Sequence, residues 1–572
     1  MRVLADAWRG REPLLFHNGK FDVDVAETHC GMPRLTWDRI HDTLFLVFLQ
    51  NPHADNLGLK PSAQRLLGVR PEEQDKVRNW ILANVPAAKK KPSSAGAYIC
   101  RAPGKLVGDY ANGDVVRTER LFKLLYDDIV SRGMLGAYQR EQRLMPVLLN
   151  TERIGIRVDV RALERDYSMY QQALGVADEW LRRQLKSPEL NLDADRDVGD
   201  ALDRCGVVTQ WTYTAPTKAH PSGQRSVAKK NMGLELFTNR RIAMVYGYRQ
   251  RLRTCLSMFF EPWLDMARAS GGVIYTTWNQ VRQAHGNDNP VGARTGRLSS
   301  TPNFQNIPKN FEDKDDNYEH PAFMKSLPPL PLMRRYLIPD SGDVWIKRDY
   351  AQQELRILAH FEDGQLLQRY NSDPDYDMHS DVQQLLREAG VEFTRPGTKI
   401  LNFGDIYGMG VGEFARKARI DVTLARKIKA LKRRMMPDFA KLDNGIKYRG
   451  RMGQPITTWG GRQYYCEEPM FDEKSGRTWT WEYKLLNYLI QGSAADCTKE
   501  AVIRYDLHPK RQARFLLTVH DEINCSAVQR RWREELAIMR EVMESIEFDT
   551  KMMSDGEYGP NWADLKEYKE AA

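Results

Sequence analysis

Two aspartates far apart in the chain stand where carboxylates are suited to metal chemistry. Asp349 ends an extended run, residues 344–350, and Asp521 lies at the expected tip of a hairpin, residues 516–523. Two carboxylates brought together can hold a pair of divalent cations about 4 Å apart, as nucleotidyl transfer requires. Each aspartate also has a simpler interpretation, because Asp commonly caps a following helix or stabilises a turn. Taken alone, the segment around Asp349 favours the cap.

The neighbours of these aspartates offer further oxygen ligands. Mg²⁺ prefers carboxylate and other oxygen ligands, so the backbone carbonyl of Tyr350 is expected to join Asp349 and Asp521. Residues 520–522 read His-Asp-Glu, which is more polar than a turn requires, and Glu522 is expected to be auxiliary. The expected cofactor is two Mg²⁺ ions, with Mn²⁺ as a substitute.

A third element lies between the two aspartates. Arg395, Lys399, Phe403 and Tyr407 recur every four residues, so a helix would place them along one face. An ordinary amphipathic helix is the usual explanation of such a stripe. Here the aliphatic residues of the segment fall at other positions, which leaves the stripe free to clamp a triphosphate and to stack on a sugar and a base.

These segments resemble the three polymerase motifs of family A (polymerase I-like) DNA polymerases. The first motif resembles residues 349–356, the second residues 395–408 and the third residues 519–522. Further matches, in the family's order, are residues 295–300, 302–308, 491–496 and 559–562, together with His379. The resemblance runs from about Gln142 to the C-terminus.

The resemblance implies a role for each matching residue. Asp349 and Asp521 would hold the metals, and Glu354 would exclude a ribose 2′-hydroxyl. Phe403 would contact the sugar and Tyr407 would guard the templating base. The remaining nucleotide-binding residues would be Arg395, Lys399 and His379 on the triphosphate, with Gln353 beside Glu354.

The resemblance also implies a set of residues that contact the minor groove of the primer-template. The hydrogen-bond acceptors in that groove are alike for all correct base pairs. Its residues would be Arg297, Asn303, Gln305, Asn306, Gln491 and His520. One position departs from the family, which often has Arg eight residues before the equivalent of Gln491. Tyr483 stands there, followed by Lys484, so that primer-strand contact is in doubt.

The N-terminal segment resembles a DEDDY-type 3′–5′ proofreading exonuclease. Residues 18–22, ending in Asp22, match its second motif, and Tyr110 with Asp114 matches its third. Tyr110 would orient the attacking water and Asp114 would bind metal. The first motif, an Asp-x-Glu on the opening strand, is absent before residue 18. Either the true gene start lies upstream, or the exonuclease has lost half of its metal ligands; for this chain we expect proofreading to be absent or impaired.

The expected fold is α+β and multi-domain. A right-hand polymerase fold, residues 137–572, follows a partial ribonuclease H-like α/β exonuclease domain, residues 1–136. A helical thumb is expected at about 160–265 and fingers at about 360–500. A mainly antiparallel palm carrying both aspartates is expected at about 266–359 and 501–572.

Bulk composition agrees with a protein that binds a polyanion. The 572 residues carry 85 Lys and Arg against 76 Asp and Glu, a net charge of +9. The seven cysteines form no C-x-x-C pair, which is typical of reduced thiols in the cytoplasm, here that of a host cell if the gene is a phage's. No run approaches the ~18 apolar residues of a membrane span. The expected partners are primer-template DNA and dNTPs, with a processivity factor or a helicase as further candidates, and no membrane.

Two alternatives remain at this point. A single-subunit RNA polymerase would share the aspartates and the basic helix, but Glu354 argues against it. A non-catalytic primer-template binding protein would not need Asp349, Asp521, Lys399 and Arg395 together. Compact length and unusual spacers favour a phage replicative enzyme over a bacterial repair enzyme.

Overall fold

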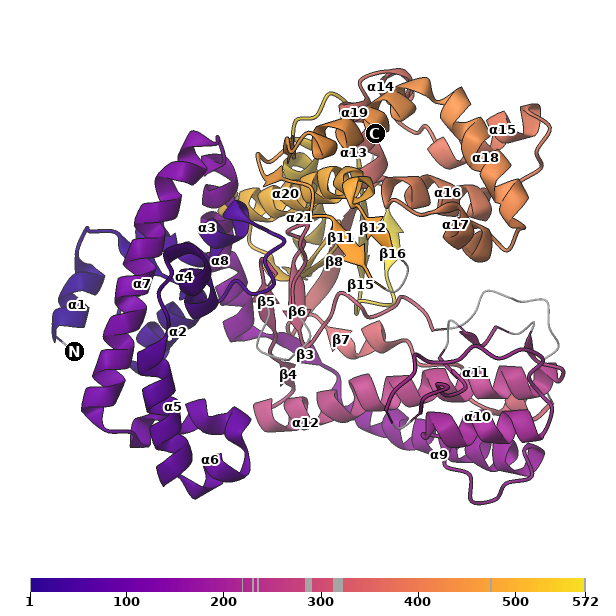
Figure 1. The fold of residues 1–572 in the computed structure, drawn as a ribbon, viewed down its shortest axis with the longest axis horizontal. Coiled ribbons are helices and arrows are strands. Elements are labelled where there is room, and N and C mark those ends of the chain that lie inside the picture. The colour runs from indigo at the N-terminus through magenta and orange to yellow at the C-terminus, as the bar shows by residue number, and fades with distance from the viewer. Residues whose placement is uncertain are drawn as a thin grey trace.

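The structure is a computed structural model that describes residues 2–218, 220–228, 231–233, 236–282, 291–311, 322–473 and 476–569. A central sheet carries helical lobes on three sides (Figure 1). One lobe is formed by the N-terminal segment, one by residues 160–270, and one by residues 353–451. The α+β class expected from the sequence is confirmed.

The central sheet has five strands in the order β13-β14-β8-β15-β16, and every neighbouring pair is antiparallel. The structure thus contains an antiparallel sheet with Asp349 on its middle strand and Asp521 in the turn between β13 and β14. The middle strand, β8, is buried along residues 344–348 because it is covered on both sides by neighbouring strands. The strands are β8 (Asp343–Tyr350), β13 (Arg514–Val519), β14 (Glu522–Val528), β15 (Ser554–Gly559) and β16 (Lys566–Tyr568).

The lobe at residues 160–270 lies across a gap from the lobe at residues 353–451 (Figure 1). It consists of α9 (Val160–Gln184), α10 (Asp195–Arg204), α11 (Arg240–Cys255) and α12 (Glu261–Ser270), with a π-helical turn at Leu256–Phe260. Helices α9 and α11 pack on each other. A small sheet of β3 (Ile156–Val158), β4 (Val273–Ile274) and β7 (Leu337–Ile338) joins this lobe to the rest, beside the pair β5 (Thr277–Asn279) and β6 (Ser299–Thr301).

The lobe that follows β8 has its own hydrophobic core. Its helices are α13 (Gln353–Glu362), α14 (Gln365–Ser372), α15 (Met378–Glu388), α16 (Arg395–Ile406), α17 (Val411–Ala418), α18 (Val422–Met435) and α19 (Pro437–Arg451). Two hairpins, β9 (Ile456–Thr457) with β10 (Gln463–Tyr464) and β11 (Met470–Asp472) with β12 (Arg477–Trp479), lead into α20 (Leu485–Leu507). Helix α20 is buried nearly all round, and α21 (Trp532–Glu544) packs beside it and against β8.

The N-terminal segment is mostly helical. Its described residues contain one sheet, in which β1 (Leu14–Phe16) and β2 (Ile40–Asp42) pair in parallel. The helices are α1 (Arg2–Arg9), α2 (Gly19–His29), α3 (Thr43–Gln50), α4 (Leu59–Leu67), α5 (Glu72–Asn84), α6 (Pro86–Lys90), α7 (Gly104–Ser131) and α8 (Leu135–Ile154). Within the ranges given above, no helix is long and apolar enough to span a membrane.

Candidate active site

Strand pairing brings Asp349 and Asp521 together. Asp349 lies near the end of β8, and Asp521 belongs to the turn between β13 and β14. Because β14 pairs with β8, Glu522 stands opposite Asp349, and the backbone N–H of Tyr350 donates to the carbonyl oxygen of Asp521 at 3.3 Å. The N-cap of α13 is Gln352. Asp349 is therefore not a helix cap, and the simpler interpretation of this residue is wrong.

The pair is electrostatically unfavourable without a cation. Oδ1 of Asp349 is buried and has no hydrogen-bond partner among the residues that the structure describes. Burial, together with the negative charges of Asp521 and Glu522, raises the pKa of Asp349 to about 8. Burial likewise raises the pKa of Asp521 to about 6. A bound divalent cation would relieve both effects, so the donor set fits a hard metal ion.

Glu522 is held beside this pair by partners of its own. Its Oε1 accepts hydrogen bonds from Asn524 Nδ2 at 3.1 Å and from Trp562 Nε1 at 3.3 Å. Arg334 lies 3.7 Å and Lys347 3.8 Å from its carboxylate. These contacts fit an auxiliary role, and they place the 559–562 motif directly behind the carboxylates. The described residues contain no cluster of three or more His, Cys, Asp or Glu side chains arranged to hold a metal.

The predicted basic and aromatic stripe lies on α16. Arg395, Lys399 and Tyr407 are exposed and Phe403 is half-buried. Thr394 caps the helix by accepting from the backbone N–H of Gly397. The stripe thus lies on the outer side of a helix whose other side packs in the core.

His379 and Arg395 meet at the start of this stripe. Asp377 accepts from Arg395 Nε and Nη2 at 2.9 and 2.8 Å and also caps α15 through the backbone N–H of His379. Burial, with Lys399 and Arg395 nearby, lowers the pKa of His379 to about 4. At neutral pH His379 is uncharged, so it can offer a triphosphate an N–H but no charge. Sequence reasoning missed Asp377, although an Asp two residues before His379 is a recognisable cap signal.

Glu354 connects three of the predicted blocks. Its Oε1 forms an ion pair with Arg297, and its Oε2 accepts from the hydroxyl of Tyr407 at 2.8 Å. Burial and the Glu354 charge raise the pKa of Tyr407. The structure does not bring Gln353 to this group. That side chain is buried and donates to Thr498 of α20 at 3.0 Å, so we correct its assignment from nucleotide contact to packing.

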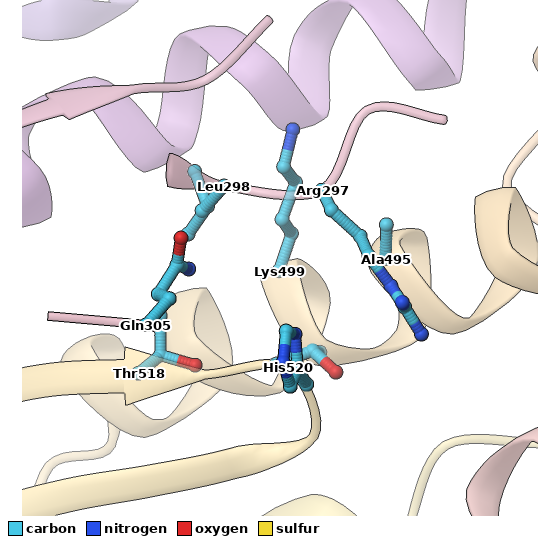
Figure 2. A pocket seen from close by; sticks show the side chains of 8 residues that line it. Arg297, Leu298, Gln305, Ala495, Lys499, Thr518 and His520 are labelled. Carbon is cyan, nitrogen blue, oxygen red and sulfur yellow. The ribbon is translucent and has the colours of Figure 1, made fainter. Parts of the chain in front are cut away.

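Three of the six predicted minor-groove residues converge. Arg297, Gln305 and His520 line one small pocket, together with Lys499 and Ala495 of α20 (Figure 2). His520 has φ +57°, a left-handed backbone conformation in the β13–β14 turn. Asn303 and Asn306 are exposed at a neighbouring turn, where Asn303 Oδ1 accepts from the backbone N–H groups of Gln305 and Asn306. Gln491 is half-buried on α20 and contacts Tyr407.

Tyr483, which stands where the family often has Arg, packs against a glycine at the end of α16. Gly408 follows the stripe with φ +72°, and a Cβ there would lie 2.5 Å from the Tyr483 ring. Tyr483 therefore packs against the end of α16. Lys484 is engaged by Glu467 at 2.9 Å and lies 4.0 Å above the Trp481 ring.

The exonuclease-like residues form a neutralised cluster. Lys60 of α4 donates to Tyr110 Oη at 3.0 Å and to Asp114 Oδ2 at 2.8 Å, and Arg117 lies 3.8 Å from Asp114. A lysine ammonium thus occupies the place beside Asp114 where a metal would have to bind. Asp22 lies in the first turn of α2 and is exposed. Lys60 carries no local sequence signal, since it contacts a helix fifty residues away.

The sequence of this chain is similar to sequences of known proteins. A family model described as DNA polymerase family A matches residues 163–564. The chain belongs to DNA polymerase family A. It is 27% identical to DNA polymerase I of Chloroflexus aurantiacus over 97% of this chain and 55% of that protein. It is 24% identical to a DNA-directed DNA polymerase of Pseudomonas phage M6 over 80% of this chain and 71% of that protein.

A solved structure shares the fold of this family A chain. It is the POL domain of Pol1 from M. smegmatis in complex with DNA primer-template and dNTP, with a TM-score of 0.73 and 22% identity, covering 98% of this chain and 88% of that one. The chain spans about half the length of the bacterial relatives, 55% of the Chloroflexus protein and 46% of DNA polymerase I from Geobacillus stearothermophilus.

Proposed function

We propose that this family A chain is a template-directed DNA polymerase that adds dNTPs to a primer 3′ end. The observation that carries the proposal is the pair Asp349 and Asp521, held together by β8 and β14, with one buried carboxylate oxygen lacking a partner. The largely exposed basic and aromatic face of α16 supports it.

The chain's own residues have distinct tasks in this proposal. Asp349, Asp521 and the Tyr350 carbonyl would hold two Mg²⁺ ions, which when bound activate a 3′-hydroxyl and neutralise a leaving pyrophosphate. Arg395 and Lys399 bind the triphosphate, and His379 donates an N–H to it. Arg297, Gln305 and His520 follow the primer-template minor groove.

Glu354 would set the sugar specificity. Arg297 and Tyr407 hold its carboxylate from two sides, so it is a fixed obstacle to a 2′-hydroxyl. This arrangement favours DNA synthesis over the alternative of a single-subunit RNA polymerase. The resemblance to a phage polymerase supports a role in phage DNA replication.

Proofreading would be absent or very weak. Asp114 is paired with Lys60, and Asp22 is exposed on another helix. Two-metal hydrolysis needs carboxylates that are free to bind cations.

Primer extension tests the proposal. Wild-type protein with Mg²⁺ and dNTPs is expected to extend a recessed primer, and Asp521→Ala to be slower by about 10³-fold or more, since a metal supplies several kcal/mol. Replacing dNTPs by rNTPs separates the DNA and RNA polymerase readings. Equal extension by wild type and Asp521→Ala would reject the proposal.

A further inference from the structure

Positive charge is concentrated in one part of the molecule. Residues 411–453, which form α17, α18 and α19, contain thirteen Lys and Arg against four Asp and Glu, a net of +9. The whole chain has the same net charge of +9. The rest of the chain is therefore neutral overall, and the basic character of the protein belongs to these three helices.

Helix α18 carries the densest part of this charge. It has six basic residues in fourteen and no acidic residue. Three of the six are used internally. Lys429 and Lys432 pair with Asp405 of α16 at 2.7 and 2.8 Å, and Arg433 pairs with Asp443 of α19 at 2.7 Å. These pairs fix the orientation of α18 on its neighbours.

The other three basic residues, Arg426, Lys427 and Arg434, form an exposed surface that we call the α18 basic face. At about 100° per residue they fall within roughly a 100° arc of the helix. Thr423 and Ala430, also exposed, are the small residues between them. In the part of the chain that the structure describes, none of the three cations forms an ion pair with an acid.

Helix α17 also carries exposed cations. Arg416 and Lys417 are exposed there and share a single acid, Glu413, at 2.6 and 3.7 Å. Helices α17 and α18 pack on each other. A solvated helix face usually mixes charges of both signs, because one sign alone is self-repelling. A face of this composition is suited to a polyanion.

The position of the α18 basic face indicates which polyanion. Lys429 donates to the carbonyl of Met409 at 2.6 Å, in the turn directly after Tyr407 and Gly408. Helix α18 is therefore attached to the end of α16 at which Tyr407 would guard the templating base. Figure 1 shows α16, α17 and α18 together in their lobe, with α16 running outward from beside the central sheet and α18 on the outer side.

We propose that the α18 basic face binds the phosphates of template strand that has not yet been copied. This inference rests on the proposed polymerase function. From Arg426 to Arg434 the helix rises about 12 Å, which matches three or four nucleotides at about 3.4 Å per nucleotide of a stacked strand. The contact is to the backbone and is independent of sequence.

The test is equilibrium binding of primer-templates with a 2-nucleotide or a 12-nucleotide 5′ template overhang, without dNTPs and over a range of salt. The variant R426A/K427A/R434A removes three exposed cations. For the long overhang its salt slope is expected to fall by about 2, since each single-strand phosphate contact contributes about 0.7. Between 50 and 200 mM salt, wild type would then lose about 16-fold more affinity than the variant. The short overhang should show no difference.

Two controls make the result specific. K89A/K90A/K91A removes three exposed lysines from the N-terminal segment and should leave both slopes unchanged. R426K/R434K keeps the charge and should keep the slope. An equal fall in the salt slope for both overhangs would show general electrostatic attraction. No fall for either overhang would show that the face binds something else, such as an acidic protein. Either result overturns the inference. Extension of the short-overhang substrate reports on the proposed function separately.

Discussion

A buried cluster of charges that joins distant parts of this family A chain gives a sharp stability prediction. Glu141 of α8 accepts from Lys499 of α20 at 2.6 Å and from Gln280 at 2.9 Å, and its Oε1 lies 3.2 Å from Arg462. Arg462 also pairs with Asp496 of α20. The four charged side chains are each 2% exposed or less. We predict that Glu141→Gln strongly destabilises the protein, because Lys499 and Arg462 lose one of their two anions, and the other, Asp496, also pairs with Arg140 at 3.5 Å.

The size of the expected stability loss depends on the burial of the charged side chains rather than on the distance between them. Breaking a buried pair by removing one partner costs about 3–5 kcal/mol, which corresponds to a fall in Tm of roughly 6–20 °C for a unit of 150–250 residues. Glu119 and Lys123 on α7 supply the matched control. They are also 2.6 Å apart, but their side chains are 50% and 71% exposed. Glu119→Gln should cost no more than about 0.5 kcal/mol.

Thermal unfolding followed by fluorescence, with pulse proteolysis as a second probe, measures both variants. Glu141→Gln/Lys499→Met removes one charge of each sign and should recover most of the lost stability. A Glu141→Gln protein as stable as Glu119→Gln would refute the reasoning, because it would mean that the cluster is hydrated or already compensated. So would a double variant that is less stable than Glu141→Gln alone.

The same cluster predicts a pH dependence. Burial lowers the pKa of Lys499 to about 8, against the attraction of Glu141. Between about pH 8 and the ordinary lysine pKa of about 10.4, the unfolded chain holds a proton that the folded chain has lost. Stability therefore rises with pH through this window, and the penalty is fully present below it. In Glu141→Gln, Lys499 loses the anion that raises its pKa. The rise of stability with pH should therefore begin at a lower pH than in wild type.

Three further predictions concern the reactions themselves. Glu354→Ala should raise ribonucleotide incorporation roughly tenfold or more, since a steric clash of this kind is worth about 1–3 kcal/mol; unchanged sugar selectivity in single-nucleotide kinetics would contradict this role. Phe403→Tyr adds a hydroxyl where the sugar is expected and should improve chain-terminator incorporation by about tenfold, the value of one hydrogen bond, as judged by termination ladders. Wild type should leave a mismatched 3′ nucleotide in place with Mg²⁺ or Mn²⁺, and Lys60→Ala should not restore its removal, because freeing Asp114 alone does not make a carboxylate site for two metal ions.

The sequence predicted the parts of the site that local patterns determine. The strand ending near Asp349, the turn at Asp521 and the helix that carries Lys399 each have a local signal, and the structure contains all three. Their assembly came from the resemblance, because pairing of β8 with β14 joins residues about 170 positions apart. Gln353 was misassigned since its neighbour Glu354 faces the site while its own side chain faces α20.

The stretch at residues 87–96 shows a different limit. Its basic and small residues are typical of an exposed loop, but it forms α6 and a 3₁₀ helix at Pro92–Arg101. Ala88 and Ala95 are buried against Val77 and Ile81 of α5. Alanine is compatible with either a loop or a buried helix face, so the outcome depends on packing with α5, which composition does not reveal.

The N-terminal segment keeps a structural task even without nuclease chemistry. Lys20 of α2 is buried, pairs with Glu152 of α8 and donates to the carbonyl of Trp278 at 2.7 Å. Arg153, next along α8, holds two further acids of α2. Since α8 also supplies Glu141 to the cluster that fixes α20, the segment supports the helix on which Gln491 lies. The packing of this segment on α8 involves no metal ligand, so it would be kept whether or not the segment has nuclease activity.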